Sequence, residues 1–120
     1  EGAPPPGVVL FSSVAARAGF PNHAAIAAAK AGVEGLALSL AADLAPAVRV
    51  NCVAPGPIWT PLQVTDNKNE EQLTSFGRQA TIGRAGQPTE LAPAYVYLAS
   101  PESSYVTGDV LNVNGGSPVA

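Results

Sequence analysis

Charged side chains are scarce in this chain, and their scarcity excludes several classes of binding partner. Only 12% of the 120 residues are Asp, Glu, Lys or Arg, and six basic against nine acidic residues leave a net charge of −3. Nucleic-acid binding depends on clustered basic side chains that neutralise phosphates, and an interfacial membrane helix depends on a cationic face. Neither pattern occurs in the sequence, so we expect no nucleic-acid partner and no membrane partner.

Cysteine and histidine are each present only once. Cys52 has no second cysteine with which to form an internal disulfide, which fits a reducing compartment and predicts a cytoplasmic protein. Its run V-N-C-V-A predicts a buried small side chain. Because neither Cys52 nor His23 has a second His or Cys at ligand spacing, we expect no metal site. No apolar stretch reaches the roughly 20 charge-free residues that a membrane-spanning helix needs.

Two predicted strands, separated by an alanine-rich stretch, organise the first half of the chain. Residues 8–12 have the continuous hydrophobic character of a strand that is covered on both faces of a parallel sheet. Residues 48–53 predict a second strand, which the A-P-G at 54–56 ends. Residues 24–45 are rich in alanine and stop before Pro46, which predicts a long helix. The order strand, helix, strand predicts a right-handed crossover between parallel strands.

The predicted helix over 24–45 carries few charges, and this affects how it can pack. Its larger apolar residues recur at steps of three and four, and we expect this stripe to face the sheet: Val33, Leu36, Leu40 and Leu44. Its charged residues are Lys30, Glu34 and Asp43. A helix so poor in charge is expected to bury a second face against a partner.

The second half of the chain continues the alternation of helices and strands. Residues 61–86 are polar and irregular, and N-K-N-E-E-Q within them predicts the start of a short helix. Residues 88–100 are typical of a helix with proline and glutamate in its first turn. Residues 109–113 predict a last strand. The fold class is therefore α/β, with helices around a parallel sheet.

Four segments carry recognisable motifs in order along nearly the whole chain. They are V-V-L-F-S-S-V-A-A at 8–16, N-H-A-A-I-A-A-A-K-A-G-V-E-G-L at 22–36, R-V-N-C-V-A-P-G-P-I-W-T-P at 49–61 and G-D-V-L-N-V-N-G-G at 108–116. Together they resemble the short-chain dehydrogenase/reductase family. In that family a strand ends in a catalytic serine, a tyrosine follows thirteen residues later, and a lysine follows four residues beyond the tyrosine. The same spacing here gives Ser13, Ile26 and Lys30.

The resemblance implies an oxidoreductase that uses NAD or NADP and acts on a small-molecule alcohol or carbonyl substrate. Ser13, at the carboxyl end of a strand, would orient the carbonyl group. Lys30 would hold the nicotinamide ribose and lower the pKa of a neighbouring phenol. The alternative interpretation of Ser13 is a serine that caps a turn, a description that also suits Ser12. The alternative interpretation of Lys30 is a solvated surface lysine.

The loop after the second predicted strand is the candidate cofactor-binding segment. The resemblance implies that the backbone at Ile58 hydrogen-bonds the nicotinamide carboxamide and that the hydroxyl of Thr60 reaches the cofactor phosphates. Pro55 stiffens such a loop, and Gly56 permits a close approach of the backbone. A plain turn at the end of a strand would explain Pro55 and Gly56, but not the whole P-G-P-I-W-T sequence.

Ile26 occupies the position of the family's tyrosine, and its side chain has no proton to donate. One interpretation is that the chain retains the fold and has lost standard hydride-transfer catalysis. The other is that a different acid has taken over, either His23 one helical turn earlier or a water aligned by Ser13 and Lys30.

A second feature of the family is missing, namely the glycine-rich turn after its first strand that meets the cofactor pyrophosphate. No G-x-x-x-G-x-G pattern follows a strand here. We therefore expect the C-terminal part of a Rossmann-like doubly wound parallel sheet, with a Pro/Gly-rich connector at 1–7, half of an NAD(P)-binding domain at 8–116 and a tail at 117–120. This chain alone is expected to be inactive.

Assembly and alternative functions follow from the same resemblance. The family's long helix lies in a subunit interface, so we expect a homo-oligomer that forms through helix 24–45 and the C-terminal helix and strand. Two other readings stay open. The protein could be a non-catalytic binding or assembly subunit, or a truncated product without independent activity.

Overall fold

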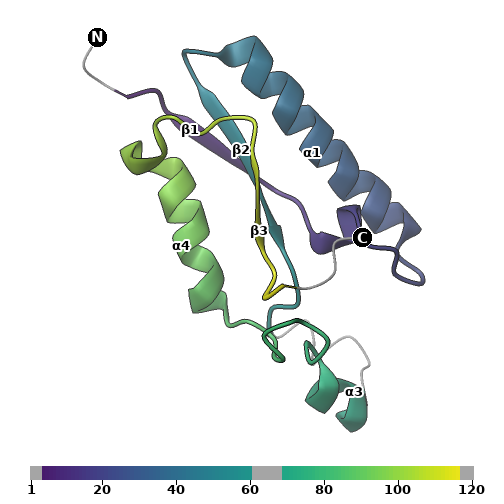
Figure 1. Ribbon diagram of the computed structural model, residues 1–120. Helices are drawn as coiled ribbons and strands as arrows, with labels where there is room; N and C mark the ends of the chain where they lie inside the picture. Colours follow the sequence, from purple (N-terminus) through teal and green to yellow (C-terminus); the bar gives the residue numbers. More distant parts are fainter. Residues whose placement is uncertain (1–3, 61–68, 117–120) are drawn as a thin grey trace.

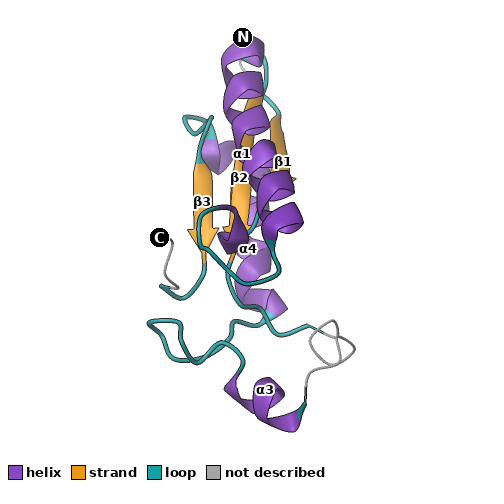
Figure 2. Ribbon diagram, turned by 90° about the vertical axis from the view of Figure 1, so that its right-hand side faces the viewer, coloured by secondary structure: helices purple, strands orange, loops and turns teal. Residues whose placement is uncertain are grey.

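The computed structural model describes residues 4–60 and 69–116, and within them three parallel strands lie between two long helices (Figure 1). The strands are β1 (Gly7–Phe11), β2 (Arg49–Pro55) and β3 (Val110–Val113), in the spatial order β1-β2-β3. The helix α1 (Ala24–Leu44) covers one face of the sheet and α4 (Pro88–Ala99) covers the other (Figure 2). The expected Rossmann-like α/β arrangement is confirmed.

β2 forms the centre of the core because it is paired along both of its edges. Val50 lies opposite Val8 of β1, and Cys52 lies opposite Leu10. Residues 50–53 have no exposed surface. This complete burial includes the polar Asn51, whose side-chain amide donates to the Val106 carbonyl at 3.0 Å. It also confirms the prediction that Cys52 is a buried small side chain.

β1 forms one border of the sheet. Within the described residues its strand partner is β2 alone, so its outer edge has no strand beside it. Val8 and Phe11 are 42% and 60% exposed. The ring of Phe11 stacks on Tyr95 of α4, with the two centroids 4.7 Å apart. This border of the sheet is therefore incompletely covered.

The face that α1 turns to the sheet differs from the predicted stripe. The buried residues of the helix are Glu34, Ala37 and Ala41, and Val33 and Leu40 pack at the margin of the core. The other two members of the predicted stripe point away from the sheet, since Leu36 and Leu44 are 52% and 40% exposed. Small side chains let the helix approach β2 closely, so alanine occupies the contact and the larger residues lie beside it.

Length and composition alone would allow α1 to cross a membrane, because an 18-residue window within it has a mean hydropathy of 1.4. Its contacts favour a different interpretation. Ala37 and Ala41 pack on β2, and Lys30 and Glu34 hydrogen-bond to the end of β1 and the residue after it. We interpret α1 as a helix that covers the sheet, with an apolar outer face.

A buried arginine fastens α4 and the following loop to the sheet. The side chain of Arg49 is 4% exposed and donates to the Leu98 carbonyl at 3.1 Å and to the Ser103 carbonyl and hydroxyl at 3.0 and 2.8 Å. Weaker bonds of 3.3 to 3.4 Å reach further carbonyls, those of Pro5, Ser100 and Val106. The positive charge thus lies against the carbonyl end of α4, where a helix dipole favours it.

The polar segment before α4 contains the predicted short helix. α3 (Glu70–Ser75) begins at Asn69, whose side chain accepts a hydrogen bond from the Gln72 amide at 2.8 Å. Residues 61–68, which begin the polar segment predicted at 61–86, lie outside the described residues.

Candidate functional site

The two serines after β1 have different environments. The amide of Ser12 donates to the Val53 carbonyl at 2.8 Å, which extends the pairing of β1 with β2. Ser13 caps a short 3₁₀ helix, η1 (Val14–Ala16), and its hydroxyl accepts a hydrogen bond from the Ala15 amide at 3.1 Å. The capping role that the sequence left open for Ser12 therefore belongs to Ser13. A hydroxyl that accepts one such bond keeps its own hydrogen to donate.

Lys30 is half-buried and reaches the same end of β1. Its Nζ atom donates to the carbonyl of Phe11 at 3.4 Å, two residues before Ser13. This bond is long and exposed to solvent, so it does not decide between a ligand-binding lysine and a solvated surface lysine. An ammonium group has three donors, so one bond to Phe11 leaves donors for a ligand.

Ile26 lies one helical turn before Lys30 and is 48% exposed. His23 is at the start of the same helix, where its Nδ1 atom is 2.7 Å from the Pro21 carbonyl and its ring packs near Phe20 with the centroids 5.7 Å apart. His23 is exposed. The Nδ1 contact fixes the ring and leaves Nε2 for exchange with solvent or a ligand.

The loop after β2 is held from one side by Gly86. Ile58 forms a parallel bridge with Gly86, in which the Trp59 amide donates to the Gly86 carbonyl at 2.8 Å and the Gly86 amide donates to the Pro57 carbonyl at 2.9 Å. Backbone groups alternate in direction along an extended chain, so the N–H and C=O of Ile58 itself point away from Gly86. That orientation is suitable for a carboxamide ligand.

Gly56 is required by packing inside the chain. A Cβ atom at this position would lie 2.7 Å from Cα of Asn114, and the Gly56 amide donates to the Val113 carbonyl at 2.9 Å. The close backbone approach predicted for this glycine is therefore made to the end of β3. The residue type alone does not argue for a cofactor at this point.

Most of the predicted site residues lie at one edge of the sheet. β1 and β2 are parallel neighbours, so their carboxyl ends meet. Ser13 follows β1, Lys30 reaches its end, and Pro55 and Gly56 end β2. This carboxyl edge is where open α/β sheets bind ligands. Thr60 is half-buried at the boundary of the described residues.

A polar cluster beside this edge is absent from the sequence prediction. Glu34, on α1, is 8% exposed and accepts hydrogen bonds from the hydroxyl of Ser12 and from Arg17, whose Nε and Nη2 atoms lie 3.2 and 2.9 Å from its Oε1. The available signal was a single acidic residue one helical turn after Lys30 on an otherwise apolar helix.

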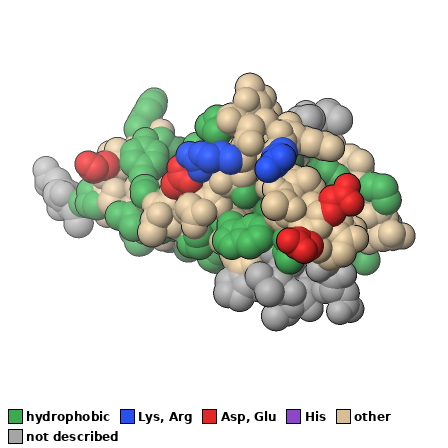
Figure 3. Space-filling view, turned by 90° about the horizontal axis from the view of Figure 1, so that it is seen from below, with side chains coloured by type: hydrophobic (Ala, Val, Ile, Leu, Met, Phe, Trp, Pro, Cys, Tyr) green, Lys and Arg blue, Asp and Glu red, His purple; other side chains and the backbone are tan. Residues whose placement is uncertain are grey.

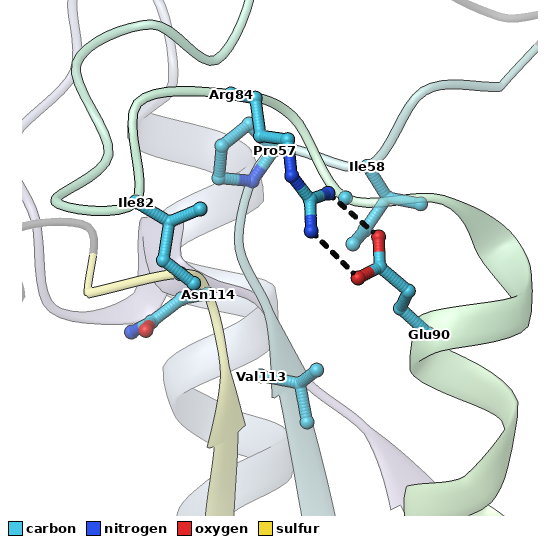
Figure 4. Close-up of a pocket in the computed structure, with 9 residues that line it drawn as sticks. Pro57, Ile58, Ile82, Arg84, Glu90, Val113 and Asn114 are labelled. Atoms are coloured by element: carbon cyan, nitrogen blue, oxygen red, sulfur yellow. Dashed lines mark hydrogen bonds and ion pairs between the residues drawn. The ribbon is translucent and has the colours of Figure 1, made fainter.

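A cavity of about 190 Å³ lies next to the loop on the side of α4 (Figure 4). Arg84 and Glu90 form a two-point ion pair across it, with N–O distances of 2.8 and 2.9 Å. The Arg84 guanidinium, followed by the Gln87 amide, lowers the pKa of Glu90 to about 2. Seen from the end that carries α3 (Figure 3), charged side chains of the described residues are scattered among apolar and neutral ones.

Comparison with known families identifies the chain. The model of the family described as "Enoyl-(Acyl carrier protein) reductase" matches residues 3–117. The chain belongs to the short-chain dehydrogenase/reductase family. Among the curated members of this family, the "Uncharacterized oxidoreductase YghA" of Escherichia coli is 47% identical over 110 residues, which are 91% of this chain and 37% of that protein.

Other members of the short-chain dehydrogenase/reductase family show the same partial overlap. The "Glucose and ribitol dehydrogenase homolog" of Oryza sativa subsp. japonica is 44% identical over 91% of this chain and 36% of its own length. The solved structure of the aldohexose dehydrogenase of Thermoplasma acidophilum in ligand-free form superimposes with a TM-score of 0.85 at 36% identity, covering 95% of this chain and 48% of that chain. The chain thus spans less than half the length of these relatives.

Proposed function

We propose that this chain is the C-terminal half of an NAD(P)-dependent oxidoreductase that interconverts an alcohol and a carbonyl compound. The observation that carries the proposal is the gathering of Ser13, Lys30 and the Pro55–Thr60 loop at the carboxyl edge of the sheet. Family membership supports it, because the relatives that match over most of this chain are named as oxidoreductases and dehydrogenases.

The residues present suit the nicotinamide end of a dinucleotide. The Lys30 ammonium has donors for ribose hydroxyls, and the N–H and C=O of Ile58 point away from Gly86 and match the acceptor and donor of a carboxamide. Thr60 supplies a hydroxyl for a phosphate. The bound cofactor would supply or accept the hydride, whereas these residues hold and orient it.

Ser13 would orient the substrate. Its hydroxyl is held by the Ala15 amide and keeps a hydrogen to donate to the carbonyl oxygen, where negative charge develops during reduction. Lys30 adds a positive charge at the same edge. The proton that completes reduction has no donor at position 26, so it would come from water or from His23, and we expect turnover to be slow.

The test of this function is Ile26→Tyr in the full-length protein that contains this segment. A positioned general acid contributes about 10² to 10⁴ in rate, so we expect kcat to rise by about 10² or more in an assay of alcohols and carbonyls with NADH and NADPH. Ile26→Phe is the matched control, because it adds the ring without the hydroxyl. Equal rates for the two variants would contradict the proposal.

A non-catalytic subunit is the second candidate, and the exposed apolar residues of α1 favour it. Ile26, Leu36 and Leu38 are about half exposed, at 48%, 52% and 52%. Under this reading the full-length protein would bind cofactor, and Ile26→Tyr would leave turnover at background while it perturbs association.

The same exposed face supports our proposal of a homo-oligomer formed through α1, α4 and β3. Analytical ultracentrifugation of Leu36→Glu tests this proposal. We also propose a cytoplasmic location, because a single cysteine fits a reducing compartment.

The isolated 120-residue chain provides a separate test of the proposed half-domain. Without a glycine-rich turn to meet the pyrophosphate, we expect negligible dinucleotide affinity. Fluorescence titration with NADH and NADPH measures this. Tight binding by the isolated chain would contradict its assignment as the C-terminal half of the binding domain.

A further inference from the structure

Glu34 is a buried carboxylate beside the proposed site, and the chemistry described above does not use it. It is 8% exposed and lies one helical turn beyond Lys30 on α1. A buried charge is costly unless hydrogen-bond donors surround it. The donors that surround Glu34 are Ser12 and Arg17, and both come from the segment that carries Ser13.

The two donors flank Ser13 in the chain. Ser12 immediately precedes it, and Arg17 follows the 3₁₀ helix η1 that Ser13 caps. The Ser12 hydroxyl donates to one carboxylate oxygen of Glu34, and Arg17 donates twice to the other. The carboxylate therefore holds both ends of the turn that positions the Ser13 hydroxyl.

Such a clamp is needed because η1 is very short. A three-residue 3₁₀ helix has poor hydrogen-bond geometry and little rigidity of its own. α1 is in contrast a helix of 21 residues that packs on β2. A link from this helix to both ends of the turn transfers the rigidity of the helix to Ser13.

We propose that Glu34 is a positioning residue that holds the Ser13 hydroxyl in place for the substrate. This proposal rests on the proposed function, since it presumes that Ser13 orients the carbonyl. Lys30 has its own contact to Phe11, so the loss of Glu34 would disturb the substrate side of the site and leave the cofactor side in place.

The first experiment tests whether Glu34 holds the turn at Ser13, and it needs no activity assay. Amide hydrogen exchange at Ala15 reports the bond to the Ser13 hydroxyl. We expect Glu34→Ala to accelerate this exchange by about tenfold or more, with the Cys52 amide of the core unchanged. Asp43→Ala is the matched control, because Asp43 is an exposed acidic residue of the same helix. Equal Ala15 exchange in the two variants would overturn the proposal.

The second experiment measures the consequence for catalysis in the full-length Ile26→Tyr variant. A small misplacement of a substrate-orienting group costs up to about 10² in rate. We expect Glu34→Ala to lower kcat by about tenfold or more, with the NADH dissociation constant within about twofold. Glu34→Gln keeps the shape, its Oε1 atom can still accept from Arg17, and its Nε2 atom can donate to the Ser12 hydroxyl oxygen, so it should restore part of kcat. In the double variant Ser12→Ala/Glu34→Ala, the loss should not exceed that of Glu34→Ala alone.

The outcomes separate this proposal from the proposed function. If Ile26→Tyr shows no turnover, the proposed function fails, and the exchange at Ala15 still decides whether the clamp exists. If turnover is present but Glu34→Ala leaves kcat unchanged, the positioning role fails while the proposed function stands. A parallel fall of kcat, cofactor affinity and melting temperature, equal for the Ala and Gln variants, would show a purely structural role and overturn the proposal.

Discussion

Replacing Arg49 by methionine should destabilise the chain strongly. The guanidinium is 4% exposed and donates to carbonyl oxygens of α4 and of the loop behind it. Methionine has a similar length and no donor, so the buried Leu98 and Ser103 carbonyls would each lose the bond from this arginine. A hydrogen bond to a charged group contributes about 1.5–3 kcal/mol.

Each carbonyl would keep one partner, because the Leu98 carbonyl accepts from the Ser103 hydroxyl at 3.1 Å and the Ser103 carbonyl accepts from the Val106 amide at 2.9 Å. The two lost bonds therefore lie at the lower end of this range and together come to about 3 kcal/mol, and the relief of no longer burying a charge offsets part of it. We therefore expect the free energy of unfolding to fall by about 2 kcal/mol, a sizeable part of the roughly 5–15 kcal/mol typical of a domain. Urea unfolding followed by circular dichroism measures the change, and an m value of about 1.5 kcal/mol/M would lower the midpoint by about 1 M.

Arg84→Met is the matched control for this measurement. Arg84 pairs with Glu90 on the surface, where solvent screens the interaction, so its replacement should move the midpoint little. Arg49→Lys should be intermediate, because an ammonium keeps the charge but cannot span the several carbonyls that the guanidinium reaches. Equal midpoints for Arg49→Met and Arg84→Met would refute the reasoning.

Two further predictions concern a glycine and an ion pair. Gly56→Ala should cost about 1–3 kcal/mol of unfolding free energy, because its Cβ would lie 2.7 Å from the backbone of Asn114. A Cβ atom at Gly32 in α1 would have no neighbour within 4 Å, so Gly32→Ala should instead raise the unfolding free energy by up to about 1 kcal/mol. Similar melting temperatures for Gly56→Ala and Gly32→Ala would contradict this. The pKa of Glu90 is lowered from 4.5 to about 2, so its solvent-screened pairing with Arg84 adds a small stabilisation above pH 4.5 that is lost as the pH falls toward 2. Glu90→Gln should flatten the pH dependence of stability in that window, and an unchanged profile in acid titration would disprove the assignment.

The sequence predicted the elements of the fold to within a few residues. The strands predicted at 8–12 and 48–53 correspond to β1 and β2. β2 is buried although it contains Arg49 and Asn51, whose side chains are hydrogen-bonded inside the chain, whereas β1 is incompletely covered. Proline and glycine mark the ends, as at Pro46 after α1. These signals are local, so they can be read without knowing the packing.

The contacts between elements could not be predicted in the same way. Hydrophobicity favours Leu36 and Leu44 as the buried face of α1, whereas the close approach to β2 selects Ala37 and Ala41. Ser12 and Glu34 lie 22 residues apart, and no periodicity predicts their hydrogen bond. The packing of Gly56 on Asn114 is likewise a contact between distant residues, so it could not be predicted from the sequence. The glycine at position 56 had instead suggested a close approach to a ligand.

The open border of the sheet at β1 bears on how the protein can be handled. An extended segment without a neighbour on one side, flanked by the exposed Val8 and Phe11, is a template on which another chain can add a strand. Produced alone, the 120-residue chain would therefore tend to aggregate as its concentration rises. A charged substitution such as Val8→Lys should delay the onset of light scattering, because natural sheets carry lysine at such borders, where its charge opposes the addition of another strand.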